Sequence, residues 1–388
     1  MNDYQLVIVG GGPAGLATAR AYRQAGGVGG VAIVADERRM PYNRPPLSKE
    51  LLRDEMSEDE LGIEEESWLD DQDVNLIGGR AVSLDSSARQ VLLSGGRALA
   101  YQTCVLATGS EPTRLPVPGA DHPGVRVLRS LDDLRELRRR LRTGTEATVI
   151  GSGFIGCEVA ASLRALQHPV TLVSDEPAPN TGRLGERVAE EIRRWLSAAD
   201  VGLVLGSAVE SIERDRERIH VHTADRAVGA DVVIMATGVA PRTELAALAG
   251  IELETGAVPA DAAMRTALPN ILAAGDVCAA RNDTAGRRLR VEHWGDALGH
   301  GSVAGRTAAG VEARWSDVPG FWSSIGSRTL KYAAWGDGFD DVRFEPGAEG
   351  AFTAWYGRDG RLVGVLAHRD DGAYEHGREM IESGASWR

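Results

Sequence analysis

Two copies of one glycine-rich pattern constrain the fold of this chain more than any other feature. Leu-Val-Ile-Val at residues 6–9 leads into Gly-Gly-Gly-Pro-Ala-Gly at 10–15, and Ala-Thr-Val-Ile at 147–150 leads into Gly-Ser-Gly-Phe-Ile-Gly at 151–156. A strand, a Gly-x-Gly-x-x-Gly turn and a helix together form the diphosphate-binding start of a dinucleotide site. We therefore expect one chain that holds two dinucleotides.

The three glycines of each copy have separate tasks. The first permits a tight turn, the second lets the backbone approach a diphosphate, and the third lets helix and strand pack closely. Free N–H groups and the positive end of the helix then hold the anion. The residues expected at the first diphosphate are Gly10, Gly12, Pro13, Ala14 and Gly15. Those expected at the second are Gly151, Gly153, Ile155 and Gly156.

Length and charge narrow the possible classes of protein. At 388 residues the chain exceeds one ordinary core, so two or three domains are expected. The net charge of −13 argues against a nucleic-acid binder, and no apolar run reaches the roughly 20 residues that span a bilayer. The N-terminal residues show no basic and apolar leader, so we expect a cytoplasmic protein. The sequence leaves the oligomeric state open.

The three cysteines favour the same compartment and argue against two kinds of site. Cys104, Cys157 and Cys278 are too far apart in the sequence for a Cys-x-x-Cys pair, so neither a zinc site nor a local redox disulfide is expected. Unpaired thiols are typical of a reducing compartment. Cys104 lies in an apolar strand, where a small buried side chain is the simpler explanation. We predict no metal site.

An acid follows the second strand of each repeat. In the first repeat, Asp36 ends the strand Val-Ala-Ile-Val-Ala at 31–35 and can accept hydrogen bonds from a ribose. In the second repeat, Ser174 is followed by Asp175 and Glu176, and no arginine comes directly after the strand. Because acids at this point repel a 2′-phosphate, NADH is favoured over NADPH, with Asp175 as the expected ribose ligand.

A loop after the first acid makes a family resemblance specific. Residues 44–49 are Arg-Pro-Pro-Leu-Ser-Lys, in which two prolines fix an extended turn between two cations. This stretch resembles the FAD-dependent NAD(P)H:ferredoxin reductases that serve oxygenases and cytochromes P450, which are related to apoptosis-inducing factor. The resemblance covers nearly the whole chain. It implies an α/β, glutathione-reductase-like fold with two Rossmann-like dinucleotide-binding domains and a small α+β C-terminal domain.

The tripeptide Ala-Thr-Gly also occurs twice, at 107–109 and at 236–238, each time after an apolar strand. Such paired strands flank the nicotinamide domain in two-dinucleotide flavoproteins, which the chain resembles. They imply a discontinuous FAD-binding domain over 1–112 and 230–314, an NAD-binding domain over 113–229, and a C-terminal interface domain over 315–388. The cofactor-binding residues expected in the two tripeptides are Ala107, Thr108, Gly109 and Gly238.

The resemblance also assigns tasks to single residues. The positions that match flavin- or nicotinamide-contacting residues of the family are Arg44, Lys49, Val82, Arg129, Asp276, Trp294 and Trp322. Val82 matches a backbone contact to the adenine, and Asp276 matches a ligand of the ribityl or diphosphate groups. Trp322 matches a residue over the nicotinamide side of the flavin. Lys49 and Glu158 are expected to pair beside the flavin, where they would set its potential and hold the nicotinamide.

Residues 315–388 have the pattern of a small α+β unit. Alternating segments at 342–344, 351–356 and 362–367 predict an antiparallel meander, with a hairpin turn at Gly-Arg-Asp-Gly over 357–360. A helix near 372–384 is expected to close the chain.

The implied activity is transfer of a hydride from NADH to FAD, followed by one-electron delivery to a [2Fe–2S] ferredoxin. No cysteine lies in residues 36–60, so electrons are expected to leave directly from the flavin. Two alternatives stay open. The family has an acid or Gln where this chain has Ser-Ile-Gly at 324–326, and a flavin edge opened there would favour an NADH oxidase or a dehydrogenase acting on a small molecule. The other alternative is a redox-responsive binding protein like the apoptosis-inducing factors.

Overall fold

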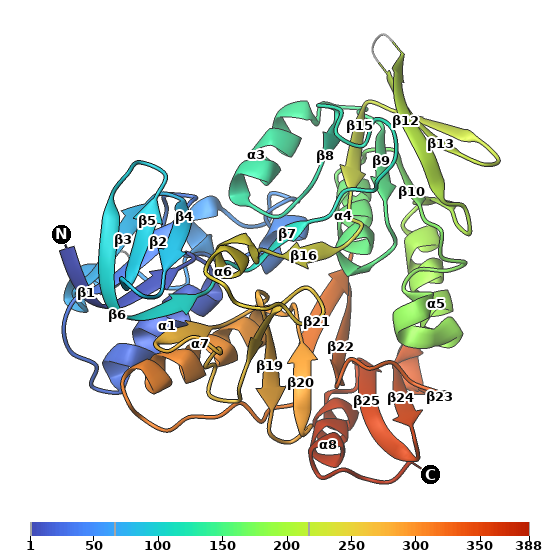
Figure 1. Ribbon diagram of the computed structural model, residues 1–388. Helices are drawn as coiled ribbons and strands as arrows, with labels where there is room; N and C mark the ends of the chain where they lie inside the picture. Colours follow the sequence, from blue (N-terminus) through green and yellow to red (C-terminus); the bar gives the residue numbers. More distant parts are fainter. Residues whose placement is uncertain (1, 66, 216–217, 388) are drawn as a thin grey trace.

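The computed structural model describes residues 2–65, 67–215 and 218–387, which form three units. Figure 1 shows the first unit on the left, the second at the upper right and the third at the lower right. The N-terminus lies at the outer edge of the first unit, and the C-terminus lies at the foot of the third. No described helix combines the length and the apolar composition needed to cross a membrane.

The first unit is built on a mostly parallel sheet around β1 (Asn2–Val9). β1 pairs in parallel with β2 (Val31–Ala35) and with β6 (Ala98–Leu106). The strand order is β3-β2-β1-β6-β5-β4, and β18 pairs with β6. Every residue of β2 is buried, as expected of a parallel strand that is covered on both faces. The other strands are β3 (Val74–Gly78), β4 (Ala81–Asp85), β5 (Gln90–Leu93) and β18 (Ile271–Ala273).

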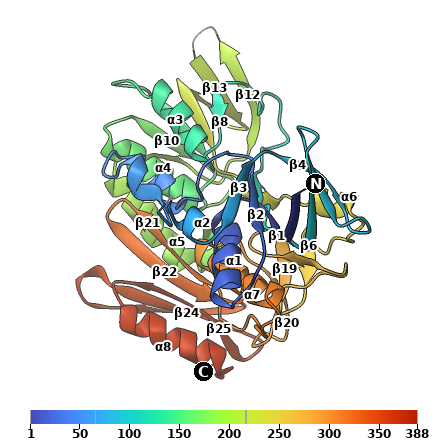
Figure 2. The same cartoon turned by 90° about the vertical axis from the view of Figure 1, so that its left-hand side faces the viewer.

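The first glycine motif opens α1 (Pro13–Gln24), which packs against α7 (Trp294–Ala308) (Figure 2). Pro13 occupies the first helical position, where its missing N–H is not needed. The two helices approach closely because Gly301 has no side chain. A Cβ at this position would lie 2.3 Å from the carbonyl oxygen of Ala14.

Shorter elements complete the first unit. They are the 3₁₀ helices Pro45–Ser48 and Glu58–Leu61, the helices α2 (Ser67–Asp71) and α6 (Glu244–Leu248), and the strands β17 (Val258–Ala260), β19 (Cys278–Asn282) and β20 (Arg287–Arg290).

The second unit has a five-stranded sheet in the order β11-β10-β9-β15-β8. Its strands are β8 (Val125–Arg126), β9 (Ala147–Ile150), β10 (Val170–Val173), β11 (Gly202–Val204) and β15 (Val232–Met235), and its helices are α3 (Leu131–Arg140), α4 (Phe154–Ala165) and α5 (Thr181–Ala198). β15 pairs in parallel with β9. The sheet of the second unit therefore extends past residue 230, the boundary expected from the sequence, to Met235.

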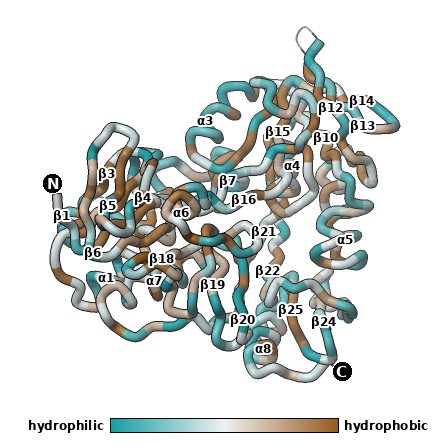
Figure 3. Tube along the Cα trace, in the orientation of Figure 1, coloured by the Kyte–Doolittle hydropathy of each residue, from teal (hydrophilic) through white to brown (hydrophobic). Residues whose placement is uncertain are grey.

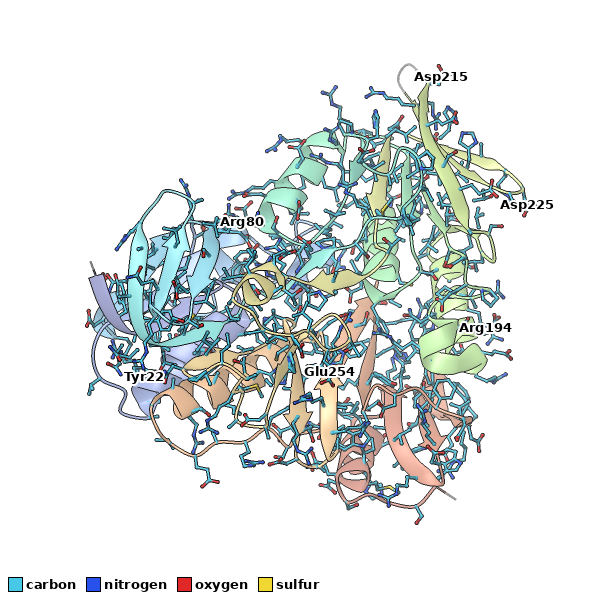
Figure 4. The ribbon with its side chains drawn as sticks, viewed as in Figure 1. Tyr22, Arg80, Arg194, Asp215, Asp225 and Glu254 are labelled. Atoms are coloured by element: carbon cyan, nitrogen blue, oxygen red, sulfur yellow. The ribbon has the colours of Figure 1, made fainter. Side chains whose placement is uncertain are left out.

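A small antiparallel sheet projects from the second unit. It consists of β12 (Val209–Asp215), β13 (Arg218–Thr223) and β14 (Ala227–Ala230). Figure 4 shows Asp215 and Asp225 at its outward ends, away from the first unit.

The third unit is an antiparallel sheet in the order β21-β22-β25-β24-β23, closed by α8 (Asp371–Glu382). The predicted meander and closing helix are confirmed. The sequence did not predict β21 and β22, although Trp322, an expected site residue, lies in β21. The strands are β21 (Gly320–Ile325), β22 (Arg328–Ala334), β23 (Asp341–Pro346), β24 (Phe352–Arg358) and β25 (Arg361–His368), and a 3₁₀ turn covers Ala348–Gly350. Figure 3 shows apolar residues concentrated along the inner strands of the units.

Two adjacent chain segments connect the first and second units. β7 (Ser110–Pro112) leads into the second unit, and β16 (Val239–Pro241) leads out of it. They pair with each other in an antiparallel ladder, with Ser110 opposite Pro241.

The contact between α1 and α7 predicts opposite effects for two glycine substitutions in α7. Gly301→Ala should destabilise the protein by about 1–3 kcal/mol, because its methyl group would overlap the backbone of α1. Gly299→Ala should be neutral or stabilise by about 0.5–1 kcal/mol, because nothing lies within 4 Å of its Cβ and alanine favours the helix. Urea unfolding of both variants measures the difference, and equal effects would contradict this packing.

Candidate active site

One large cavity lies where the three units meet. Its volume is about 1490 Å³, above the roughly 300–1,000 Å³ of an ordinary single-ligand pocket. Most of the predicted site residues line it. They are Gly10, Gly12, Pro13, Ala14, Asp36, Arg44, Lys49, Val82, Ala107, Thr108, Gly109, Arg129, Gly153, Ile155, Glu158, Gly238, Asp276, Trp294 and Trp322. Both glycine motifs thus open onto the same space.

Four predicted site residues do not line this cavity: Gly15, Gly151, Gly156 and Asp175. The three glycines lie in the strand–helix contacts behind the turns, where their role is to let backbones approach. Asp175 is exposed and does not line the cavity, and the neighbouring Glu176 lines it instead.

The first glycine of each motif lies against the Ala-Thr-Gly strand of its own unit. Gly10 has a φ of +134°, and a Cβ there would lie 1.9 Å from the carbonyl oxygen of Ala107. Gly151 has a φ of +104°, and its Cβ would lie 2.4 Å from the carbonyl oxygen of Ala236. Only glycine combines this conformation with such an approach. In each unit, the glycine motif is therefore in contact with the Ala-Thr-Gly tripeptide.

The helix starts of both motifs have the same geometry. Gly12 and Gly153 are the N-cap residues of α1 and α4, both are extended, and neither helix start is capped by a side chain. A Cβ on Gly15 would lie 2.0 Å from the oxygen of Gly10, so the third glycine closes the turn tightly. Uncapped N–H groups at a helix start form an anion site.

Ion pairs fix the loop that carries the Arg-Pro-Pro-Leu-Ser-Lys motif. Arg44 pairs with Glu37 at 2.5 Å and donates to the backbone oxygen of Arg129 at 2.8 Å. Glu37 also accepts a hydrogen bond from the hydroxyl of Tyr42 at 2.6 Å. Asp36 has no such partner among the described side chains and faces the cavity, which leaves its carboxylate available to a ligand.

Asp276 lines the cavity and is held by two partners. Arg129 pairs with its Oδ2 at 3.0 Å, and Ser110 donates to the same oxygen at 2.6 Å. Sequence reasoning missed Ser110, although it directly follows the first Ala-Thr-Gly tripeptide. It also missed Arg80, which lines the cavity beside Val82 and is labelled in Figure 4.

The expected pair of Lys49 and Glu158 lies at the junction of the three units. Lys49 Nζ is 3.3 Å from Glu158 Oε2, and the two side chains are only 5% and 3% exposed. The same oxygen accepts from Ser48 Oγ at 2.5 Å. The other carboxylate oxygen accepts from Ser323 Oγ at 2.8 Å and from the backbone N–H of Ser324 at 3.2 Å. The three serines were not predicted, because nothing in their spacing links them to Glu158.

Aromatic side chains form one wall of the cavity. Trp294 and Trp322 meet edge to face with ring centroids 6.3 Å apart. Trp322 is 46% exposed, so it is not a core residue. The indole N–H of Trp294 is buried and has no partner among the described residues. A buried donor without an acceptor fits a polar ligand such as a flavin ring.

The three cysteines are inert in this structure. All three are buried free thiols. Burial raises the pKa of Cys104 and of Cys278 to about 12 and raises that of Cys157 still further above its usual range. Since the thiolate is the reactive form, these residues do not supply a redox-active dithiol.

A buried histidine lies within α7. His300 packs edge-on against Trp315 with ring centroids 4.3 Å apart, and its Nδ1 is 3.7 Å from Cys278 Sγ. Burial lowers the pKa of His300 to about 4, because the charged form would lose its hydration. His300 is therefore neutral near pH 7.

Comparison with known proteins agrees with this arrangement. Residues 4–301 match the family described as pyridine nucleotide-disulphide oxidoreductase. The chain belongs to this family. The fold class expected from the sequence, two Rossmann-like units with a small α+β unit, is confirmed, and so is the expected family resemblance.

Members of the family match over the whole chain. The chain is 33% identical to the anthranilate 1,2-dioxygenase system ferredoxin–NAD(+) reductase component of Burkholderia cepacia, over 99% of this chain and 96% of that protein. It is 30% identical to human apoptosis-inducing factor 3 over its full length but spans only 64% of that relative. The crystal structure of a ferredoxin reductase for a cytochrome P450 system from Rhodopseudomonas palustris superposes with a TM-score of 0.93 at 31% identity, covering 99% of this chain and 96% of that one.

The buried carboxylate predicts unequal costs for two substitutions. Glu158→Gln should lower the free energy of unfolding by about 3–5 kcal/mol, because Lys49 would keep a buried charge without a counter-ion. Ser323→Ala removes one hydrogen bond to the same carboxylate and should cost about 1 kcal/mol. Urea unfolding measures the stability of both variants. A Glu158→Gln variant as stable as wild type would contradict a buried ion pair between Lys49 and Glu158.

His300 predicts a pH dependence of stability. Between pH 6.5 and about 4 the unfolded chain takes up a proton on this residue and the folded protein does not, so acidification should destabilise the fold by up to about 3 kcal/mol from this group. His300→Gln should lose less stability over the same interval. Unfolding at pH 7.5, 5.5 and 4.5 tests this, and parallel losses in both proteins would exclude the contribution.

Proposed function

We propose that this protein is an FAD-dependent oxidoreductase that takes a hydride from NADH and passes electrons singly to a [2Fe–2S] ferredoxin serving an oxygenase or a cytochrome P450. The observation that carries the proposal is the single cavity onto which both dinucleotide turns and the Lys49–Glu158 pair open. Two dinucleotides bound at these turns would bring their redox rings into one space, where hydride transfer requires mainly positioning.

The first unit is the proposed FAD site. Gly10, Gly12 and the N-terminus of α1 would hold the diphosphate, Asp36 a ribose, and Asp276 the ribityl or diphosphate groups. The backbone of Val82 would contact the adenine. The positive end of α7, which begins at Trp294, would stabilise negative charge on a reduced ring.

The second unit is the proposed nicotinamide site. Gly153 and the start of α4 would hold the NADH diphosphate, and Glu176, the acid after β10 that lines the cavity, would favour NADH over NADPH. Lys49 and Glu158 would hold the nicotinamide end and set the electrostatic potential at the flavin. Trp322 would cover the side of the ring that the nicotinamide approaches.

A bound flavin supplies the change from a two-electron donor to a one-electron acceptor. The buried, protonated cysteines favour an acceptor outside the protein over an internal disulfide. The ferredoxin reductases among the relatives support a ferredoxin as that acceptor. Free thiols also fit the cytoplasm, the location that we propose.

A second candidate is a redox-responsive binding protein. The match to human apoptosis-inducing factor 3, which covers this whole chain and 64% of that relative, supports it. In that case NADH would reduce the flavin, but turnover would stay slow with every acceptor.

The deciding experiment is NADH oxidation by the FAD-loaded protein, first with oxygen alone and then with a [2Fe–2S] ferredoxin and cytochrome c. We expect at least a tenfold faster rate with the ferredoxin, because one-electron transfer is the proposed output. Equal fast rates with and without ferredoxin would indicate an NADH oxidase or small-molecule dehydrogenase. A reduced flavin with uniformly slow turnover would favour the binding protein.

A further inference from the structure

In the second unit, the position directly after β10 is not occupied by an acid. β10 ends at Val173 and is followed by Ser174, which is 4% exposed, whereas a dinucleotide-binding strand is ordinarily followed by a ribose-binding acid. Of the two acids that come next, Asp175 is exposed and does not line the cavity, whereas Glu176 lines it. The residue that meets the nucleotide is therefore decided by the geometry of this turn.

A closed ring of hydrogen bonds holds Glu176. Its backbone N–H donates to Ser174 Oγ at 3.2 Å. Ser174 Oγ lies 2.7 Å from the hydroxyl of Ser152, the middle residue of the second Gly-Ser-Gly turn. Ser152 Oγ donates in turn to Glu176 Oε2 at 3.2 Å. If Ser174 donates to Ser152, every member of the ring has a partner, which is what two buried hydroxyl groups require.

The other carboxylate oxygen of Glu176 is held by the start of α5. The backbone N–H of Gly182, at the start of α5, donates to Glu176 Oε1 at 2.9 Å. Asn180, which caps α5 in a left-handed conformation with φ of 60°, donates its side-chain amide to the carbonyl oxygen of Ser152 at 3.1 Å. Among the described residues no cation pairs with Glu176, so its negative charge is not neutralised and lone pairs remain for a ligand.

We propose that Glu176 is the specificity-determining residue for the nicotinamide nucleotide, and that Ser152 and Ser174 are its positioning residues. This inference rests on the proposed function, in that it assigns the second unit to NADH. The carboxylate accepts hydrogen bonds from the adenosine ribose hydroxyls of NADH and repels the 2′-phosphate of NADPH. Because the ring of hydrogen bonds fixes its carboxylate, Glu176 takes the role of the acid that is ordinarily found two positions earlier, where this chain has Ser174.

A cation that follows Gly182 in the chain, Arg183, could compete with Glu176 for control of the selectivity. It lines the cavity, and its guanidinium lies 5.9 Å from the ring centroid of Phe154. Were Arg183 to bind a 2′-phosphate, it would reverse the preference, so the test has to separate the two residues.

The test uses the FAD-loaded protein and two probes, NAD+ and NADP+, whose dissociation constants are measured by calorimetry. For Glu176→Gln we expect weaker NAD+ binding by about tenfold and tighter NADP+ binding, so that the selectivity ratio falls by at least tenfold. Asp175→Asn is the matched control, which removes an adjacent charge outside the cavity and should leave the ratio unchanged. Ser152→Ala should weaken NAD+ binding several-fold without a gain for NADP+, because it loosens the carboxylate but keeps its charge.

Three results would overturn the inference. They are an unchanged selectivity ratio in Glu176→Gln, a change of the same size in Asp175→Asn, or a selectivity ratio that changes only in Arg183→Ala. Anaerobic bleaching of the flavin by NADH separates this question from the proposed function. Bleaching by NADH with selectivity independent of Glu176 would refute only the residue assignment. Binding selectivity that depends on Glu176 without bleaching by either reduced nucleotide would refute the proposed activity and leave the assignment standing. Failure of both nucleotides to bind would refute both.

Discussion

The buried carboxylate of Glu158 is the interaction on which the junction of the three units depends. It projects from the second unit, and its partners come from the first unit (Ser48 and Lys49) and from the third (Ser323 and Ser324). A buried charge is tolerated only when it is paired and hydrogen-bonded. The first and third units therefore each supply donors that the carboxylate cannot lose cheaply, and this part of the cavity lining is the place where the three units are joined.

Much of the fold could be predicted from the sequence, because glycines with special backbone needs leave a local signal. Gly10 and Gly151 mark the turns, and the Ala-Thr-Gly strands that contact them mark the same two units. The contacts around Glu158 could not be predicted beyond Lys49. They join residues more than a hundred positions apart, and serines at a unit boundary look like any surface serine in a sequence.

Glu176 illustrates a different limit. Sequence spacing locates the end of a strand, but it does not say which of two consecutive acids lines the cavity. That choice depends on hydrogen bonds from Ser152 and from the start of α5, which only the folded chain brings together. For a related reason, the sheet of the second unit extends past the domain boundary that we expected near residue 230. Spacing alone does not show that β15, which precedes the exit strand β16, completes the sheet of the second unit beside β9.

The antiparallel ladder between β7 and β16 has a consequence for how this chain could be rearranged. Because the entry and exit of the second unit are hydrogen-bonded neighbours, that unit is an insertion whose two ends meet. It could be exchanged for the matching unit of another family member without altering the length of either connection. A working hybrid would have to retain a carboxylate at the position of Glu158, since the host unit keeps Lys49 and the C-terminal unit keeps both serines.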